Sequence, residues 1–81
     1  MHEVGIAHEL CLAVEAAARQ HGLGRVQVIQ LVIGHERLVC HEALQFAFDL
    51  LKPAPLMQDT RLQIEGRPGY DLLIDQIEGE P

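Results

Sequence analysis

The residues most able to do chemistry stand at the start of the sequence, Met1-His2-Glu3. If the chain begins there with a free amine, that nitrogen, the amide nitrogen of residue 2 and the His2 imidazole can close two chelate rings on one metal ion. Three nitrogens then lie in a plane, which suits Ni(II) or Cu(II), whereas zinc prefers a tetrahedron. The amide nitrogen or carboxylate of Glu3, a water or a partner's ligand can complete the set. The tripeptide alone is weak evidence, because a histidine at position 2 is usually just solvated.

Other metal-binding residue types are scattered along the chain. Cys11 and Cys40 are too far apart to form a CxxC knuckle, and their apolar surroundings predict two buried thiols. His35, Cys40 and His41 lie close in sequence, but their spacing matches no established motif, so we expect no second site there. His8 is expected to face solvent rather than the tripeptide. No nucleophile with a base, phosphate loop or pair of facing carboxylates is evident, so we do not expect an enzyme.

Length and charge narrow the class of protein. A chain of 81 residues makes one domain, burying roughly 60–65% of its unfolded surface. The net charge of −6 argues against nucleic acid as a partner, because phosphates require a basic patch. No apolar run reaches the roughly 20 residues of a membrane span, and no basic segment precedes an apolar one as in a signal peptide. We therefore expect a cytoplasmic protein without a membrane partner.

Apolar periodicity and turn residues predict five elements in the order α-β-α-β-β. They are a helix over 5–21, a strand over 25–34, a helix over about 41–52, and strands over 60–66 and 70–78. The first helix presents an apolar stripe of Ile6, Leu10, Ala13, Val14 and Ala17. The second presents Leu44, Ala47, Phe48 and Leu51.

The simplest way to bury both stripes is a two-layer α/β (α+β) sandwich, with two helices on one face of a three-stranded mixed sheet. The short link Arg67-Pro68-Gly69 predicts that the last two strands pair antiparallel, although the final strand could lie on either side of its neighbour. Residues 1–78 form the single domain, and 79–81 are expected to be a frayed tail.

The strand over 25–34 is apolar on both faces. Val26 and Val28 lie on one face, and Ile29, Leu31 and Ile33 on the other. Such a strand is either central and covered on both sides, or bulged. In so short a chain the second cover could come from a partner subunit, which makes a homodimer one expectation.

Several segments together resemble a known family. Met1-His2-Glu3 leads into a helix, Leu31-Val32-Ile33-Gly34 ends a strand, and Glu42-Ala43-Leu44-Gln45-Phe46-Ala47-Phe48 and Thr60-Arg61-Leu62-Gln63-Ile64 follow. This pattern resembles the hydrogenase and urease nickel-incorporation proteins, the HypA/HybF family, along nearly the whole chain.

The resemblance implies a small metallochaperone that binds one Ni(II) transiently through its N-terminal segment. By position, His2 is the essential imidazole ligand, Met1 supplies the amine, and Glu3 an amide nitrogen or carboxylate. The implied partners are a nickel-delivery GTPase and the large subunit of a nickel enzyme, such as nickel-iron hydrogenase, under assembly.

One departure from the family is large. Family members carry two CxxC pairs that bind a structural zinc between the last two strands, whereas Gly66-Arg67-Pro68-Gly69-Tyr70 stands there in this chain. The family's small residues after Gly34 are also replaced, by His35-Glu36-Arg37. We therefore expect the nickel-binding base domain without a structural zinc.

Two other classes of function compete with this interpretation. The fold could serve as a protein-interaction or dimerisation module, with His2 a relic. Alternatively, the chain could handle sulfur or copper through Cys11 or Cys40, which would require a thiol of lowered pKa.

Overall fold

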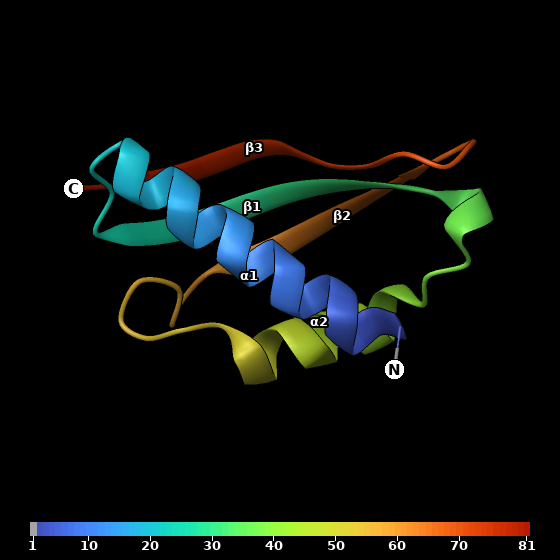
Figure 1. Cartoon of the computed structure of the whole chain (residues 1–81), viewed down its shortest axis with the longest axis horizontal. Helices are drawn as coiled ribbons and strands as arrows, with labels where there is room; N and C mark the ends of the chain where they lie inside the picture. The colour runs from blue at the N-terminus through green and yellow to red at the C-terminus, as the bar shows by residue number, and fades with distance from the viewer. Residues whose placement is uncertain (1) are drawn as a thin grey trace.

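The computed structural model describes residues 2–81 and contains two helices and a three-stranded sheet (Figure 1). In chain order the elements are α1 (His2–Gln20), β1 (Arg25–Gly34), a short 3-10 helix η1 (His35–Arg37), α2 (His41–Leu51), β2 (Arg61–Arg67) and β3 (Leu72–Glu80). The predicted order α-β-α-β-β is confirmed. Among the described residues, no helix combines the length and apolar character needed to cross a membrane.

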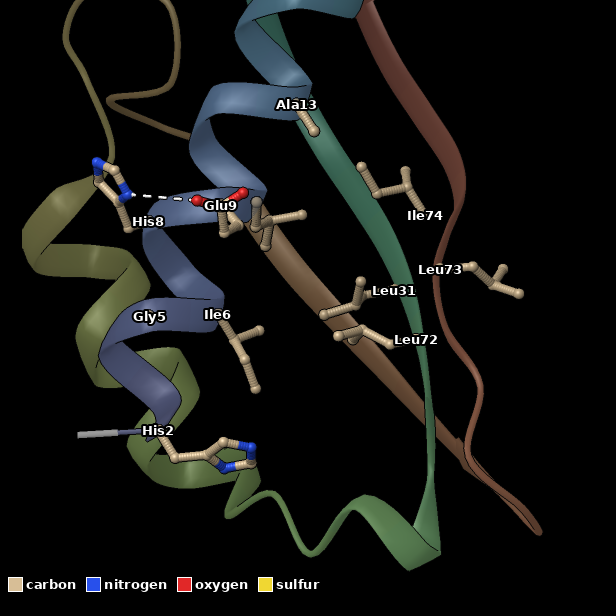
Figure 2. Close-up of a pocket in the computed structure, with 11 residues that line it drawn as sticks. His2, Gly5, Ile6, His8, Glu9, Ala13, Leu31, Leu72, Leu73 and Ile74 are labelled. Atoms are coloured by element: carbon tan, nitrogen blue, oxygen red, sulfur yellow. Dashed lines mark ion pairs between the residues drawn. The ribbon is translucent and has the colours of Figure 1, made fainter.

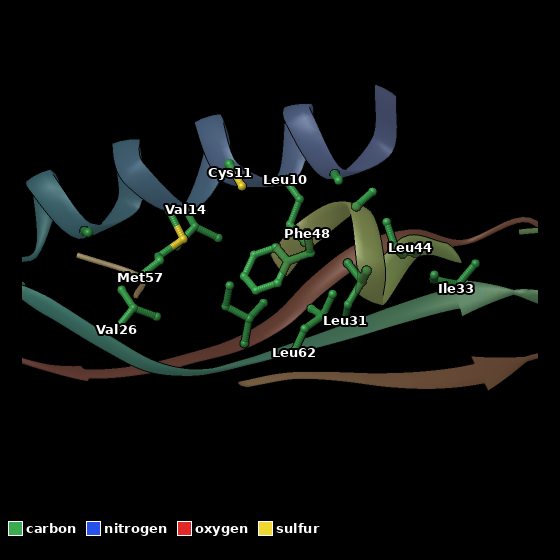
Figure 3. Close-up of a cluster of buried hydrophobic side chains, with 14 residues drawn as sticks. Leu10, Cys11, Val14, Val26, Leu31, Ile33, Leu44, Phe48, Met57 and Leu62 are labelled. Carbon is green, nitrogen blue, oxygen red and sulfur yellow. The ribbon is translucent and has the colours of Figure 1, made fainter. Parts of the chain in front are cut away.

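Both helices lie on one face of the sheet, and the core fills the space between the layers (Figure 3). Phe48 of α2 is fully buried at its centre. The buried side of α1 is rotated relative to the predicted stripe: Ala13 is exposed, whereas Ala7, Cys11 and Ala18 are buried with Leu10 and Val14. In α2 the predicted stripe is correct except for Leu51, which is exposed.

The sheet order is β2-β1-β3, so the predicted antiparallel pairing of the last two strands is wrong. β1 lies between them, pairing parallel with β2 and antiparallel with β3. The link between β2 and β3 crosses the end of β1, where the backbone N–H of Gly34 donates to the carbonyl of Asp71 at 2.6 Å. A Cβ on Gly34 would overlap the backbone of Gly69, so glycine permits this crossing. The hairpin prediction failed because the most apolar strand is buried best at the centre.

β1 is both central and bulged, and its register with β3 shifts between Val26 and Val28 and again between Gln30 and Leu31. The first shift places Val26 in the core with Ile29, Leu31 and Ile33, not on the face of Val28 as predicted. Val28 and Val32 lie outside this core cluster but are also buried within the single chain.

The end of the chain is ordered by pairing. Gly79 and Glu80 belong to β3 and pair with Val26 and Arg25, and the N–H of Gly24 donates to the Glu80 carbonyl at 2.9 Å. The expected fraying of residues 79–81 is therefore wrong for these two residues.

Candidate metal site

The first turn of α1 carries two of the three predicted ligands. Helix α1 begins at His2, three residues before the predicted start, and Met1 lies outside the described residues. The first N–H groups of a helix have no acceptor within that helix. The amide nitrogens of His2 and Glu3 can therefore bind a metal without breaking a hydrogen bond of the helix.

Glu3 connects the start of α1 to the start of α2. Its Oε2 accepts a hydrogen bond from the backbone N–H of Cys40 at 3.0 Å, and its side chain is only 12% exposed. Cys40 is the N-cap residue of α2 and makes no capping bond with its own side chain. The carboxylate of Glu3 therefore supplies a cap from outside the helix, where the helix dipole favours negative charge.

This contact also sets the ionisation of Glu3. The hydrogen bond from the Cys40 amide is the largest cause that lowers the pKa of the Glu3 carboxyl, followed by the bond from its own amide. Partial desolvation opposes this shift, and nearby His2 adds to it. Glu3 is thus ionised at neutral pH, and a metal ion would meet a carboxylate already held by α2.

The His2 imidazole is exposed and lies beside that carboxylate. Its Nδ1 is 3.8 Å from Oε2 of Glu3. Nitrogen and oxygen ligands stand about 2 Å from a bound ion, and neighbouring ligands of a planar site about 2.8 Å apart, so these two atoms would have to approach by about 1 Å to share an ion. Nδ1 is also the nitrogen that closes the six-membered ring with the amide nitrogen of His2.

An apolar groove of about 540 Å³ runs between α1 and β3 (Figure 2). Its floor is made by aliphatic side chains of three elements, among them Ile6, Leu31 and Leu72, and the His2 ring stands at its end nearest the start of the chain. His8 lies on the rim and faces solvent as predicted, with its Nδ1 3.8 Å from Oε2 of Glu9.

The two cysteines differ in exposure. Cys11 is buried as predicted, and burial, aided by Glu15, raises the pKa of its thiol. This counts against a reactive thiolate at Cys11. Cys40 is exposed, contrary to prediction, because it precedes α2 and stands outside the apolar stripe of that helix.

Side chains alone do not form a complete metal site within residues 2–81. No three His, Cys, Asp or Glu side chains converge there in a metal-binding group. The candidate site around His2 therefore depends on backbone nitrogens in addition to side chains.

Comparison with known proteins identifies the family. The family model described as hydrogenase/urease nickel incorporation, metallochaperone, hypA, matches residues 1–71. The chain belongs to the HypA family. The matched region runs from the N-terminal tripeptide through α1, β1, α2 and β2 to the link before β3.

Several HypA proteins are similar to this chain. Hydrogenase maturation factor HypA of Moorella thermoacetica is 40% identical over 68 residues, which cover 84% of this chain and 60% of that protein. The HypA of Roseiflexus sp. is 40% identical over 84% of this chain and 55% of its own length. The HypA of Cereibacter sphaeroides strain KD131 is 37% identical over 93% of this chain and 66% of its own length. The chain thus spans between about half and two thirds of the length of these HypA relatives.

Two features of this HypA domain were missed by sequence reasoning. The bond between Glu3 and Cys40 joins residues 37 positions apart, and the groove needs α1 to lie beside β3. No local pattern encodes either feature. A glutamate at the third position and an uncapped start to the second helix were the only hints.

Proposed function

We propose that this chain is a nickel-binding metallochaperone, or an accessory protein, for the maturation of a nickel enzyme such as nickel-iron hydrogenase. In this proposal Met1, His2 and Glu3 bind one Ni(II) transiently. The observation that carries it is the HypA match across residues 1–71, which includes the tripeptide. The proximity of His2 Nδ1 to the Glu3 carboxylate at the start of α1 supports it.

The ligands proposed are the Met1 amine, the His2 amide nitrogen and the His2 imidazole. The fourth is the Glu3 amide nitrogen or the free lone pairs of its carboxylate. Amide nitrogens must lose their protons to bind, so affinity should rise with pH. The positive end of the α1 dipole disfavours an added cation. This opposition weakens retention of the ion, which suits a protein that must pass it on.

The partners follow from the same proposal. The relatives carry the name hydrogenase maturation factor. We propose the large subunit of a nickel enzyme as the recipient. A separate GTPase would supply nucleotide hydrolysis, since the sequence contains no phosphate loop. The proposed site of action is the cytoplasm, and folding without a structural zinc stays a prediction.

A nickel titration of untagged protein at neutral pH tests the site. We expect His2→Ala, and a variant with one residue added before Met1, each to lose the N-terminal Ni(II) site. His8→Ala, which removes an exposed imidazole from the same helix, should retain it. A yellow, diamagnetic complex would support planar nitrogen coordination. Equal binding by all four proteins would show that the tripeptide is not the site.

A docking module is the second candidate, and the apolar groove beside His2 favours it. A homodimer through β1 has less support, because Val28 and Val32 are already buried within one chain. Sedimentation of metal-free protein separates the two functions. A tight dimer that nickel leaves unchanged would favour docking over metal delivery.

A further inference from the structure

Two histidines from different elements approach the same glycine at the end of the sheet. His35 begins η1 and His41 begins α2, and both rings lie over Gly66 of β2. A Cβ built on Gly66 would stand 2.8 Å from Nε2 of His35 and 3.7 Å from Cε1 of His41. The fold therefore gathers two exposed imidazoles that are six positions apart in sequence.

The backbone beneath His35 is held in place. Next to it, the N–H of Gly34 donates to the carbonyl of Asp71 at 2.6 Å and that of Glu36 to Gly69 at 3.0 Å. The N–H of Leu38 closes η1 by donating to the His35 carbonyl at 3.2 Å. These bonds fix η1 against the link between β2 and β3, so the position of the His35 ring does not depend on a free loop.

The backbone beneath His41 is equally constrained. The preceding residue, Cys40, accepts from the N–H of Leu44 at 3.0 Å and donates its own N–H to Glu3. These two backbone hydrogen bonds of Cys40 hold the start of α2, where His41 is the first residue. A metal ion bound by fixed ligands loses less entropy to ordering them.

Gly66 makes room for the pair. Glycine inside a strand weakens it and often marks the close approach of another group. Here that group is the His35 imidazole, since even a methyl group on Gly66 would press on Nε2.

The arginines at this end of the sheet are engaged elsewhere. Nε of Arg37 donates to the Tyr70 carbonyl at 2.5 Å, and Arg67 pairs with Glu65 at 3.2 Å and with Asp71 at 3.9 Å. The carboxylates of Glu65 and Asp71 partly offset the charge of Arg67, whereas the Tyr70 carbonyl holds the Arg37 side chain without neutralising it.

The geometry points to a second metal-binding position, in which the imidazoles of His35 and His41 hold a divalent late transition-metal ion. Imidazole suits Ni(II), Cu(II) and Zn(II), not Mg(II) or Ca(II). Because no third metal-binding side chain joins them within residues 2–81, water fills the remaining positions. Such an ion exchanges readily and leaves positions open for ligands of a partner. The pair shares no ligand with the N-terminal tripeptide.

Titration with Ni(II) alone tests this position in a His2→Ala background, where the tripeptide site is removed. We expect about one weak equivalent to remain, and His35→Gln or His41→Gln each to lower its affinity at least tenfold. The matched control is His21→Gln, because His21 is exposed in the turn after α1 and its replacement should leave binding unchanged.

Gly66→Ala gives an independent test that keeps both imidazoles. Its added methyl should displace the His35 ring and weaken nickel binding, while circular dichroism checks that the variant is folded. In proton NMR of the His2→Ala protein, nickel should first shift the ring signals of His35 and His41. The proposal is overturned if His35→Gln and His41→Gln bind like their parent, or if His21→Gln loses as much. Loss of the tripeptide site alone would count against the proposed function and not against this pair.

Discussion

The two metal-binding regions proposed for this chain are built in opposite ways. The N-terminal site uses consecutive residues and backbone nitrogens, so most of its geometry is local. The His35–His41 pair is assembled from η1, α2 and a glycine of β2, and exists only where these elements meet. A local chelate is readable in a sequence and can outlast the fold. A pair of ligands assembled by tertiary structure is not readable in the sequence and is lost when the fold is lost.

One hydrogen bond connects the two regions. Glu3 follows His2 and holds the amide of Cys40, which precedes His41. The first turn of α1 and the start of α2 are therefore fixed relative to one another. Substitutions that loosen the fold should therefore weaken nickel binding at the His35–His41 pair more than at the N-terminal tripeptide.

Removing the side chain at the centre of the core should separate the behaviour of the two sites most clearly. Phe48→Ala leaves a cavity where the largest fully buried side chain stands, which costs about 3–5 kcal/mol of unfolding free energy. We expect the His35–His41 pair to lose nickel and the tripeptide to retain it. Nickel titration measures both, and urea unfolding in parallel measures the loss of stability. Phe46→Ala, in the same helix but 68% exposed, should change stability by less than about 0.5 kcal/mol. Parallel loss of both sites in Phe48→Ala would contradict the proposed difference.

The crossing at Gly34 should produce a smaller and more local effect. Gly34→Ala forces the backbone of Gly69 away and shifts the neighbouring His35, at a cost of about 1–3 kcal/mol. Nickel affinity should fall at the pair but not at the tripeptide. The matched control is Gly5→Ala, which meets no atom within 4 Å and should stabilise α1 by about 0.5–1 kcal/mol. Weaker nickel binding at the tripeptide of Gly34→Ala would argue that the regions are not independent.

The contact between Glu3 and Cys40 should make the stability of the fold depend on pH. Because the pKa of Glu3 is lower in the folded chain, its contact stabilises the fold at neutral pH and the gain disappears as pH falls through the lowered pKa. Glu3→Gln should flatten this acid dependence of the melting temperature in metal-free protein. Glu9→Gln, at an exposed position of the same helix, should not. An unchanged acid profile in Glu3→Gln would remove Glu3 as the connection between the helices.

Local patterns were reliable where neighbours in sequence decide the structure. The Val- and Ile-rich run between Gly24 and Gly34 predicted β1 with its observed bounds, and Pro53 placed the end of α2 within a residue. The N-terminal ligands were likewise predictable as a motif, because they are consecutive.

Long-range packing determined the features that local sequence patterns did not predict. The inward face of α1 was misassigned because alanines suit either side of a helix, and only tertiary packing selects Ala7 over Ala13. The strand order depended on competition for the centre of the sheet, which a short link such as Arg67-Pro68-Gly69 does not reveal. The meeting of His35 and His41 followed from that same order.

The non-adjacent placement of β2 and β3 sets a minimum length for the link between them. Residues 68–71 must span two strand spacings, about 9.5 Å, so a two-residue hairpin turn, which joins adjacent strands, could not replace them. Lengthening the link meets no such limit, since extra residues can project beyond the end of β1. This edge of the fold is therefore an attachment point where a whole appended module could be gained or lost in evolution without moving the first turn of α1.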